Sequence, residues 1–161
     1  MTSPRGTVLP PLDPLQATLG VTNASFVAQT ADWVPAHLYA TLEAAYHHNG
    51  FSFIRILQRC PKFTADVFLQ NVKNPDLTEL LVHKEGVNAP GLEKLFKNQR
   101  THDPKDLDEA RILAARTDKL RLGIFFKDDS LPVYDEIRAV PPVSPEEKVK
   151  KLEKEFDRYA V

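Results

Sequence analysis

The sequence predicts an α/β domain with a mostly parallel sheet and flanking helices. A near-continuous apolar run from Phe51 to Pro61, rich in aromatic and β-branched side chains, is typical of a strand buried on both faces. A shorter apolar segment, residues 24–29, and an amphipathic helix that opens near Pro35 come before it. Strand, helix and strand within about thirty residues indicate a βαβ unit with parallel strands and a right-handed crossover.

Composition and charge limit the class of protein. The chain has 161 residues, a net charge of −1 and one cysteine. This length fits one domain that buries about two-thirds of its unfolded surface. The balanced charge argues against nucleic acid or an anionic membrane as a partner. One cysteine fits a reducing compartment, and neither a secretory signal nor an apolar run near the roughly 20 residues of a membrane span is present, so we expect a cytoplasmic protein.

Prolines mark the two ends of the chain. Most of the 13 lie in residues 4–14 and 132–145, which indicates extended arms around a compact middle. We expect the N-terminal arm to lie against another chain. The predicted division is a main domain, residues 1–137, and a linker with a C-terminal amphipathic helix, residues 138–161. Ser144 and the acidic residue three positions later form a capping box for that helix. Its apolar face comprises Val149, Leu152, Phe156 and Tyr159.

Two helices are expected before the central strand. Asp13-Pro14 is an N-cap followed by proline at the first helical position, and Gly20 ends this short helix. Asp32 and Pro35 open a second helix of about four turns, which Asn49-Gly50 ends. Its expected buried face comprises Val34, Leu38, Leu42 and Ala45.

The pattern after the central strand is less regular. Residues 64–73 and 75–83 are predicted as two helices, residues 84–88 as a turn, and residues 92–96 as a short helix. Asp103-Pro104 opens the next helix, which extends to about Thr117. A further strand over residues 120–126 and a turn at residues 128–130 follow.

Cys60 stands where the central strand ends. The carboxyl ends of strands in open α/β sheets are where ligands bind, which makes this thiol a candidate cofactor ligand. A lone cysteine is also often a buried, inert hydrophobe. One thiolate cannot hold a [4Fe–4S] cluster, which takes four, so the other ligands would come from another polypeptide. A nucleophilic role is disfavoured because no histidine lies within ten residues C-terminal of Cys60.

The histidines do not form a site in the sequence. His47 and His48 are adjacent, so on a helix they point about 100° apart, and His83 and His102 are isolated. We interpret them as surface or helix-end residues. Metal, nucleotide and hydrolase motifs of the common kinds are absent. The sequence thus predicts a domain that has one thiol suited to bind a cofactor, lacks a complete active site and forms part of a larger protein or complex.

Several segments resemble a known family. Residues 5–15, 24–28 and 50–63, and later residues 122–127 and 132–136, are similar to the second half of the β subunit of 2-oxoacid:ferredoxin oxidoreductases. This is the subunit that binds thiamine diphosphate, and the 2-oxoglutarate type looks closest. The resemblance covers roughly residues 1–60 and 103–136. It implies half of a thiamine-diphosphate-binding fold.

The resemblance also implies cofactors and partners. Cys60 corresponds to the last cysteine ligand of the family's [4Fe–4S] cluster. Thr2 and Ser3 correspond to residues just after a loop near thiamine diphosphate. The family's Gly-Asp-Gly site for the diphosphate and Mg²⁺ is absent, so these cofactors would be bound mainly outside this chain. The implied partners are the rest of the β subunit, the α/γ-type subunits and ferredoxin.

The implied activity is the coenzyme A-dependent oxidative decarboxylation of a 2-oxoacid, with 2-oxoglutarate expected, and electron transfer through the cluster to ferredoxin. Because the chain matches only half of a subunit, we do not expect it to act alone; either the gene is split or the product is truncated. An alternative is a non-catalytic α/β interaction or assembly module derived from that subunit. A third interpretation is an unrelated domain with a core cysteine.

Overall fold

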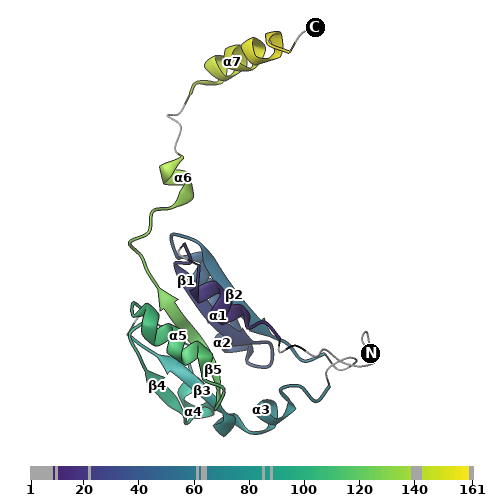
Figure 1. Cartoon of the computed structure of the whole chain (residues 1–161), viewed down its shortest axis with the longest axis vertical. Coiled ribbons are helices and arrows are strands. Elements are labelled where there is room, and N and C mark those ends of the chain that lie inside the picture. The colour runs from purple at the N-terminus through teal and green to yellow at the C-terminus, as the bar shows by residue number, and fades with distance from the viewer. Residues whose placement is uncertain are drawn as a thin grey trace. The chain divides into compact units, whose positions relative to one another are not determined.

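The computed structural model describes residues 9, 11–21, 23–60, 62, 65–84, 86–87, 89–138 and 143–159. By its internal contacts the chain divides into two units, residues 1–131 and residues 132–161. The first unit contains the sheet and its covering helices (Figure 1). Each unit is described by itself below.

The first unit has one sheet, whose described strands follow the order β2-β1-β5-β3-β4. Parallel pairing joins β1 to β2, β3 to β5 and β3 to β4, whereas β1 and β5 are antiparallel. The predicted mostly parallel α/β fold is therefore confirmed. The antiparallel step places the carboxyl ends of β1 and β2 at one edge and those of β3, β4 and β5 at the other. The strands are β1 Phe26–Ala31, β2 Ser52–Leu57, β3 Thr78–Val82, β4 Gln99–Thr101 and β5 Leu120–Lys127.

Short helices connect the strands and cover both faces of the sheet. Helices α1 and α5 pack against each other on one face, in front of the strands in Figure 1. Helix α2 packs on β1 and β2, and its Ala44 and Ala45 join a core cluster around Phe26 and Ile124. The helices are α1 Pro14–Leu19, α2 Pro35–Tyr46, α3 Leu69–Lys73, the 3₁₀ helix η1 Pro75–Leu77, α4 Leu92–Leu95 and α5 Leu107–Ala115.

Helix α1 begins as predicted. The Asp13 carboxylate accepts hydrogen bonds from the backbone N–H groups of Leu15 and Gln16 at 2.9 and 3.0 Å. These bonds satisfy two of the amide donors that a helix start leaves unpaired. Gly20 follows the last helical residue, also as predicted. The predicted strand–helix–strand unit over β1, α2 and β2 is confirmed with parallel strands.

The position of β2 corrects one expectation. Strand β2 is an outermost strand of the described sheet and is mostly half-buried, whereas all six residues of β1 are buried. The strand buried on both faces is therefore β1 and not the apolar run that follows it. The sequence predicts the opposite because β1 carries the polar residues Gln29 and Thr30. In the fold, Gln29 Nε2 donates to the Arg121 carbonyl and the Thr30 hydroxyl pairs with His37.

The region after Cys60 contains further corrections. Residues 75–83, predicted as a helix, form a 3₁₀ turn followed by strand β3, and β4 was not predicted. Leu80 and Leu81 are adjacent in β3 and enter different core clusters, which is strand behaviour. Helix α5 begins three residues later than predicted, because Asp106 and not Asp103 provides the cap.

Strands β3 and β5 approach closely at Gly123. This glycine has φ +134°, and a methyl group placed there would lie 2.8 Å from Leu81 Cβ. Both the backbone angle and the contact favour glycine.

The second unit contains α6, Tyr134–Ile137, and α7, Pro145–Asp157. Helix α7 has the predicted capping box. The Ser144 hydroxyl accepts from Glu147 N–H, and the Glu147 carboxylate accepts from Ser144 N–H, both at 3.2 Å. Its apolar face is exposed within this unit, at Val149, Leu152, Phe156 and Tyr159. Among the described residues, no helix has the length and apolarity needed to cross a bilayer.

Candidate functional site

Cys60 lies three residues beyond the end of β2 and is half-buried. It therefore stands at the sheet edge that carries the carboxyl ends of β1 and β2, as the sequence predicts. Within the described part of the chain, no three His, Cys, Asp or Glu side chains gather closely enough to hold a metal ion. The thiol fits a cofactor ligand in its chemistry and place, but a cluster bound there would need ligands from elsewhere. Thr2 and Ser3, the predicted residues near thiamine diphosphate, lie outside the described residues.

A charged pair ties this edge to helix α1. The Arg55 guanidinium, on β2, donates to Asp13 Oδ2 at 3.1 Å, and both side chains are about one-third exposed. Asp13 is the same residue that caps α1, so one carboxylate holds both the helix start and the edge strand. Partial exposure limits the stabilisation from the pair to about 1 kcal/mol or less.

A buried arginine organises the neighbouring part of the edge. Arg121, at the start of β5, is 2% exposed and donates from Nε to Glu79 Oε2 at 2.8 Å. Its Nη2 donates to Asp118 Oδ1 at 2.7 Å, and its Nη1 donates to the carbonyl of Arg116, which follows α5, at 3.0 Å. Arg100 also donates to Glu79 Oε2, at 3.0 Å. One buried guanidinium thus joins β3, β5 and the end of α5.

The electrostatics of Glu79 follow from this network. Burial by itself raises the pKa of the Glu79 carboxyl, because it disfavours the charged form. Hydrogen bonds and positive charge from Arg100 and Arg121 outweigh that effect and hold the pKa below its usual range. Glu79 is therefore ionised in the folded protein at neutral pH.

His37 is buried, which contradicts the predicted surface position. It is fully enclosed between α2 and β1, with Nδ1 2.8 Å from the hydroxyl oxygen of Thr30. The Thr41 hydroxyl donates to the His37 carbonyl at 2.7 Å. Burial lowers the pKa of His37 to about 4, so the ring is neutral at physiological pH.

His48 follows the end of α2, which fits the predicted helix-end position, but its side chain is buried. Its Nε2 lies 2.9 Å from Ser25 Oγ, and its Nδ1 lies 3.3 Å from Asp129 Oδ1. Ser25, His48 and Asp129 thus stand in the same order as the serine, histidine and aspartate of a hydrolytic triad. However, Ser25 is 1% exposed and donates to the Phe51 carbonyl at 3.2 Å, so no substrate reaches its oxygen. We interpret the three residues as a structural link between the start of β1 and the turn after β5.

His83 and His102, which are far apart in the sequence, come together at the opposite edge. They follow the parallel strands β3 and β4, and their rings are perpendicular with centroids 5.4 Å apart. His102 is buried, and burial lowers its pKa. Each histidine directly follows a strand. Once β3 and β4 are recognised as parallel neighbours, this position in the sequence predicts that the two histidines lie close together.

Comparisons with known proteins show what this domain is similar to. The family model for the C-terminal part of the pyruvate ferredoxin oxidoreductase β chain matches residues 92–140. A comparison with curated proteins finds no match. The structural comparison agrees in fold, and together the two comparisons confirm the resemblance to the C-terminal part of the β subunit of a 2-oxoacid:ferredoxin oxidoreductase.

The particular structure that this chain resembles is 2-oxoglutarate:ferredoxin oxidoreductase from Magnetococcus marinus, solved with 2-oxoglutarate, coenzyme A and succinyl-CoA bound. The TM-score is 0.63 and the sequence identity is 24%. The match covers 94% of this chain and 48% of the solved chain, so this chain spans about half the length of that relative. At this level of identity the likeness shows the fold.

Proposed function

We propose that this chain is part of a cytoplasmic 2-oxoacid:ferredoxin oxidoreductase complex and supplies one thiolate, Cys60, to a [4Fe–4S] cluster. The position of Cys60 supports this role most directly, because the thiol is half-buried at the carboxyl edge of two parallel strands in a fold of the matching class. The proposed reaction is the coenzyme A-dependent oxidative decarboxylation of 2-oxoglutarate, the substrate bound in the solved relative.

Exposed apolar surface on α2 and β2 supports assembly with another chain. On the outer face of α2, Tyr39 and Tyr46 are 69% and 85% exposed. On β2, Ile56 is 46% exposed, and Phe51 just before the strand is 59% exposed. Strand β2 pairs with β1 on one side, and its other side faces no strand among the described elements. An open strand edge beside exposed aromatic side chains is typical of a surface that a partner covers.

The residues present fit a shared cluster and not a complete one. Thiamine diphosphate would supply carbanion chemistry when bound, and Mg²⁺ would anchor its diphosphate. We propose that another chain holds most of that site, with Thr2 and Ser3 nearby. Cys60 would fix one corner of the cluster. Its partial burial would limit contact between the sulfur and water and so influence the reduction potential.

The experiment compares Cys60→Ser with Gln58→Ser in the complex purified anaerobically with its partner chains. Gln58 lies two residues away and is exposed, so its replacement is a matched control. We expect Cys60→Ser to lose the iron, the acid-labile sulfide and the visible absorbance of one cluster while the complex stays assembled. Gln58→Ser should keep all three. Unchanged iron content and an unchanged spectrum in Cys60→Ser would reject the ligand role.

The alternative function is a non-catalytic assembly module, and the exposed apolar surface on α2 and β2 is the observation that favours it. The same variants separate the two functions. Coenzyme A-dependent reduction of ferredoxin by 2-oxoglutarate should fall with the cluster if Cys60 is a ligand. If the chain is only an assembly module, Cys60→Ser should leave that activity unchanged.

A further inference from the structure

Helix α7 has an apolar stripe that is exposed within the second unit. The α7 stripe comprises Val149, Leu152, Phe156 and Tyr159. These four side chains are between 53% and 78% exposed. Tyr159 lies beyond the C-cap, but its N–H donates to the Phe156 carbonyl at 3.0 Å, so it continues the last turn. Because exposed apolar side chains that lie side by side mark an interaction site, we expect a partner to cover this stripe.

The spacing of the α7 stripe is that of a contact between two helices. Its residues lie at positions 149, 152, 156 and 159, which are successive a and d positions of a heptad repeat. Every other residue from 146 to 158 is charged. A helix that packs on a globular core has a wider apolar face, whereas a stripe of a and d positions alone is typical of a coiled coil. The occupant that best fits the α7 stripe is therefore another helix with the same narrow face.

The charges of α7 argue against a membrane surface as the occupant. Residues 146–158 contain five cationic and five acidic side chains, so the net charge of this segment is zero. Helices that lie on anionic membranes carry an excess of lysine and arginine on their polar face. The balanced charge of α7 instead suits a protein partner that carries both signs of charge.

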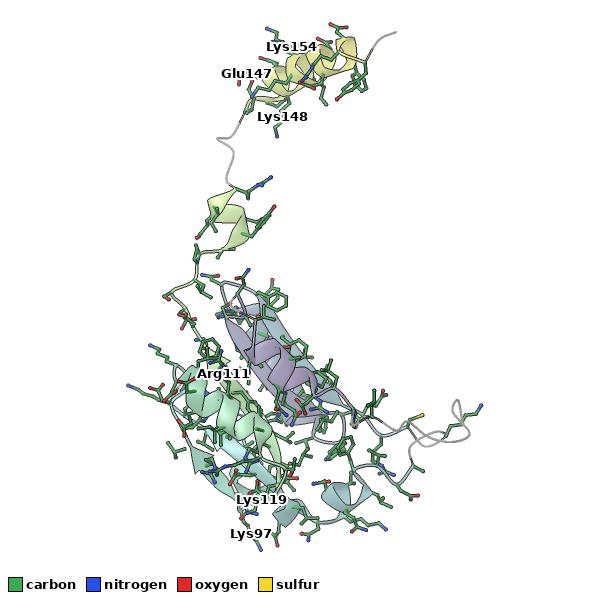
Figure 2. All side chains as sticks on the ribbon, viewed as in Figure 1. Lys97, Arg111, Lys119, Glu147, Lys148 and Lys154 are labelled. Carbon is green, nitrogen blue, oxygen red and sulfur yellow. The ribbon has the colours of Figure 1, made fainter. Side chains whose placement is uncertain are left out.

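The charges beside the stripe are complementary to those of a second copy. In a parallel coiled coil, the g residue of one helix lies beside the e residue of the following heptad in its partner. These positions in α7 are Lys148 and Glu153, and both are exposed. Figure 2 shows Lys148 projecting from the first turns of the helix. Two copies in register would therefore form two Lys148–Glu153 contacts, whereas an antiparallel pair with the same apolar layers would bring Glu153 beside its own copy.

The size of the stripe limits the strength of such a pair. Burying these four side chains on each of two helices removes on the order of 1,000 Å² from water, which is the low end of specific interfaces. The stripe extends over about two heptads, whereas a coiled coil that is evident from sequence alone has about three or four. We therefore expect a dissociation constant in the micromolar range or weaker.

We propose that α7 pairs with the α7 of a second copy of this chain, parallel and in register, with Lys148 of each helix beside Glu153 of the other. A two-fold axis relates the two helices, so the same stripe serves both copies and no further copy is added. The pair involves neither Cys60 nor the cluster, so its failure would leave the proposed function untouched. Within the proposed complex it would hold two copies of this chain together.

Sedimentation velocity on the full chain, from low micromolar to submillimolar concentration, tests the pair. We expect a monomer–dimer equilibrium that Leu152→Glu abolishes, because this change places two like charges in the apolar centre of the contact. Tyr39→Ser is the control for the other exposed apolar surface of the chain, on α2, and should leave the equilibrium unchanged.

Charge variants test the register. Lys148→Glu should weaken dimerisation roughly three- to tenfold, because each dimer loses two exposed contacts between opposite charges and gains two between like charges. Lys151→Glu makes the same change at an exposed position away from the stripe and is the matched control. Lys148→Glu combined with Glu153→Lys reverses both charges and should restore the wild-type dissociation constant. Circular dichroism checks that each variant keeps the helix.

Disulfide formation reports the orientation of the two helices. Leu152→Cys in a Cys60→Ser background leaves one thiol per chain, in the middle of the stripe. A parallel pair in register brings the two copies of this thiol together. Mild oxidation should therefore link Leu152→Cys chains faster than Lys151→Cys chains, whose thiol lies at a position away from the a and d residues.

Several results would overturn the proposal. A chain that stays monomeric at submillimolar concentration forms no such pair. A dimer that Leu152→Glu leaves unchanged uses another surface. Failure of Glu153→Lys to rescue Lys148→Glu, or equal oxidation rates for the two cysteine variants, would exclude the parallel register. Co-sedimentation of a monomeric chain with phosphatidylglycerol vesicles would assign the stripe to a membrane surface instead.

Discussion

Replacing Arg121 by methionine is the sharpest test of how this domain is held together. The change keeps a long apolar stem and removes the guanidinium. It breaks the bonds to Glu79, Asp118 and the carbonyl that ends α5, which are 2.8, 2.7 and 3.0 Å long. Glu79 is 7% exposed, so its carboxylate would remain buried with Arg100 as its main partner.

The magnitude follows from the burial of these groups. Removing one member of a buried ion pair costs roughly 3–5 kcal/mol, because the remaining charge is left without compensation. Arg100 still neutralises part of the Glu79 charge, so we expect a loss near the lower end, roughly 3 kcal/mol. The Asp118 contact adds little, because that side chain is 60% exposed.

The sign of the pH dependence gives a second check. The pKa of Glu79 lies below its reference value of 4.5 in the folded protein, so its ion pairs contribute stability above that pH. This contribution is lost as the pH falls through the folded pKa. The difference between wild type and Arg121→Met should therefore be largest near pH 7 and should shrink on acidification.

Urea unfolding at pH 7 and at acidic pH measures both effects, with circular dichroism and Trp33 fluorescence as probes. Arg158→Met is the control, because Arg158 forms a 3.2 Å ion pair with Glu155 in which both side chains are exposed. It should change the free energy of unfolding by about 1 kcal/mol or less. A loss below about 1 kcal/mol in Arg121→Met, or a loss independent of pH, would refute the reasoning.

Three further predictions concern other parts of the first unit. Gly123→Ala should lower the free energy of unfolding by roughly 2–4 kcal/mol from strain and overpacking. Gly91→Ala, also at positive φ but with nothing within 4 Å, should cost only the backbone strain of about 1–2 kcal/mol. Equal losses of stability in thermal melts of the two variants would contradict the predicted clash with Leu81. Asp13→Ala should destabilise the protein by about 1 kcal/mol and Asp13→Asn by much less, because asparagine also caps helices. Equal urea midpoints for the two variants would mean that the ion pair with Arg55 contributes more than the helix cap. His37, with a pKa of about 4, should keep a neutral ring in NMR titrations above that pH; stability should fall as the pH drops from 6.5 towards 4, and a ring that titrates near 6.5 would refute its burial.

Much of the fold follows from local sequence signals. The cap at Asp13, the βαβ unit and the capping box of α7 were predicted because each depends on residues close in the chain. The prediction that β2 is the fully buried strand was wrong, because the burial of β1 depends on partners that are distant in the sequence. Gln29 looks unsuited to a core strand until its amide meets the Arg121 carbonyl, 92 residues away.

The candidate site shows the same division. The position of Cys60 was predictable, because the end of a parallel strand is visible in the sequence. The charged network around Arg121 was not predictable, because Glu79, Arg100 and Asp118 come from separate segments that only the folded sheet brings together. The pairing of His83 with His102 was missed for a related reason, since residues 75–83 have the pattern of a helix and β4 has only three residues.

The open side of β2 has a consequence for how such a chain is handled when no partner is available. On the side of β2 that no described strand covers, backbone groups beside Tyr39, Tyr46 and Phe51 form a template to which an extended, apolar polypeptide can add. A surplus copy would then be prone to precipitate or to be degraded. In the assembly that we propose, the cell would therefore lose any excess of this chain over its partner.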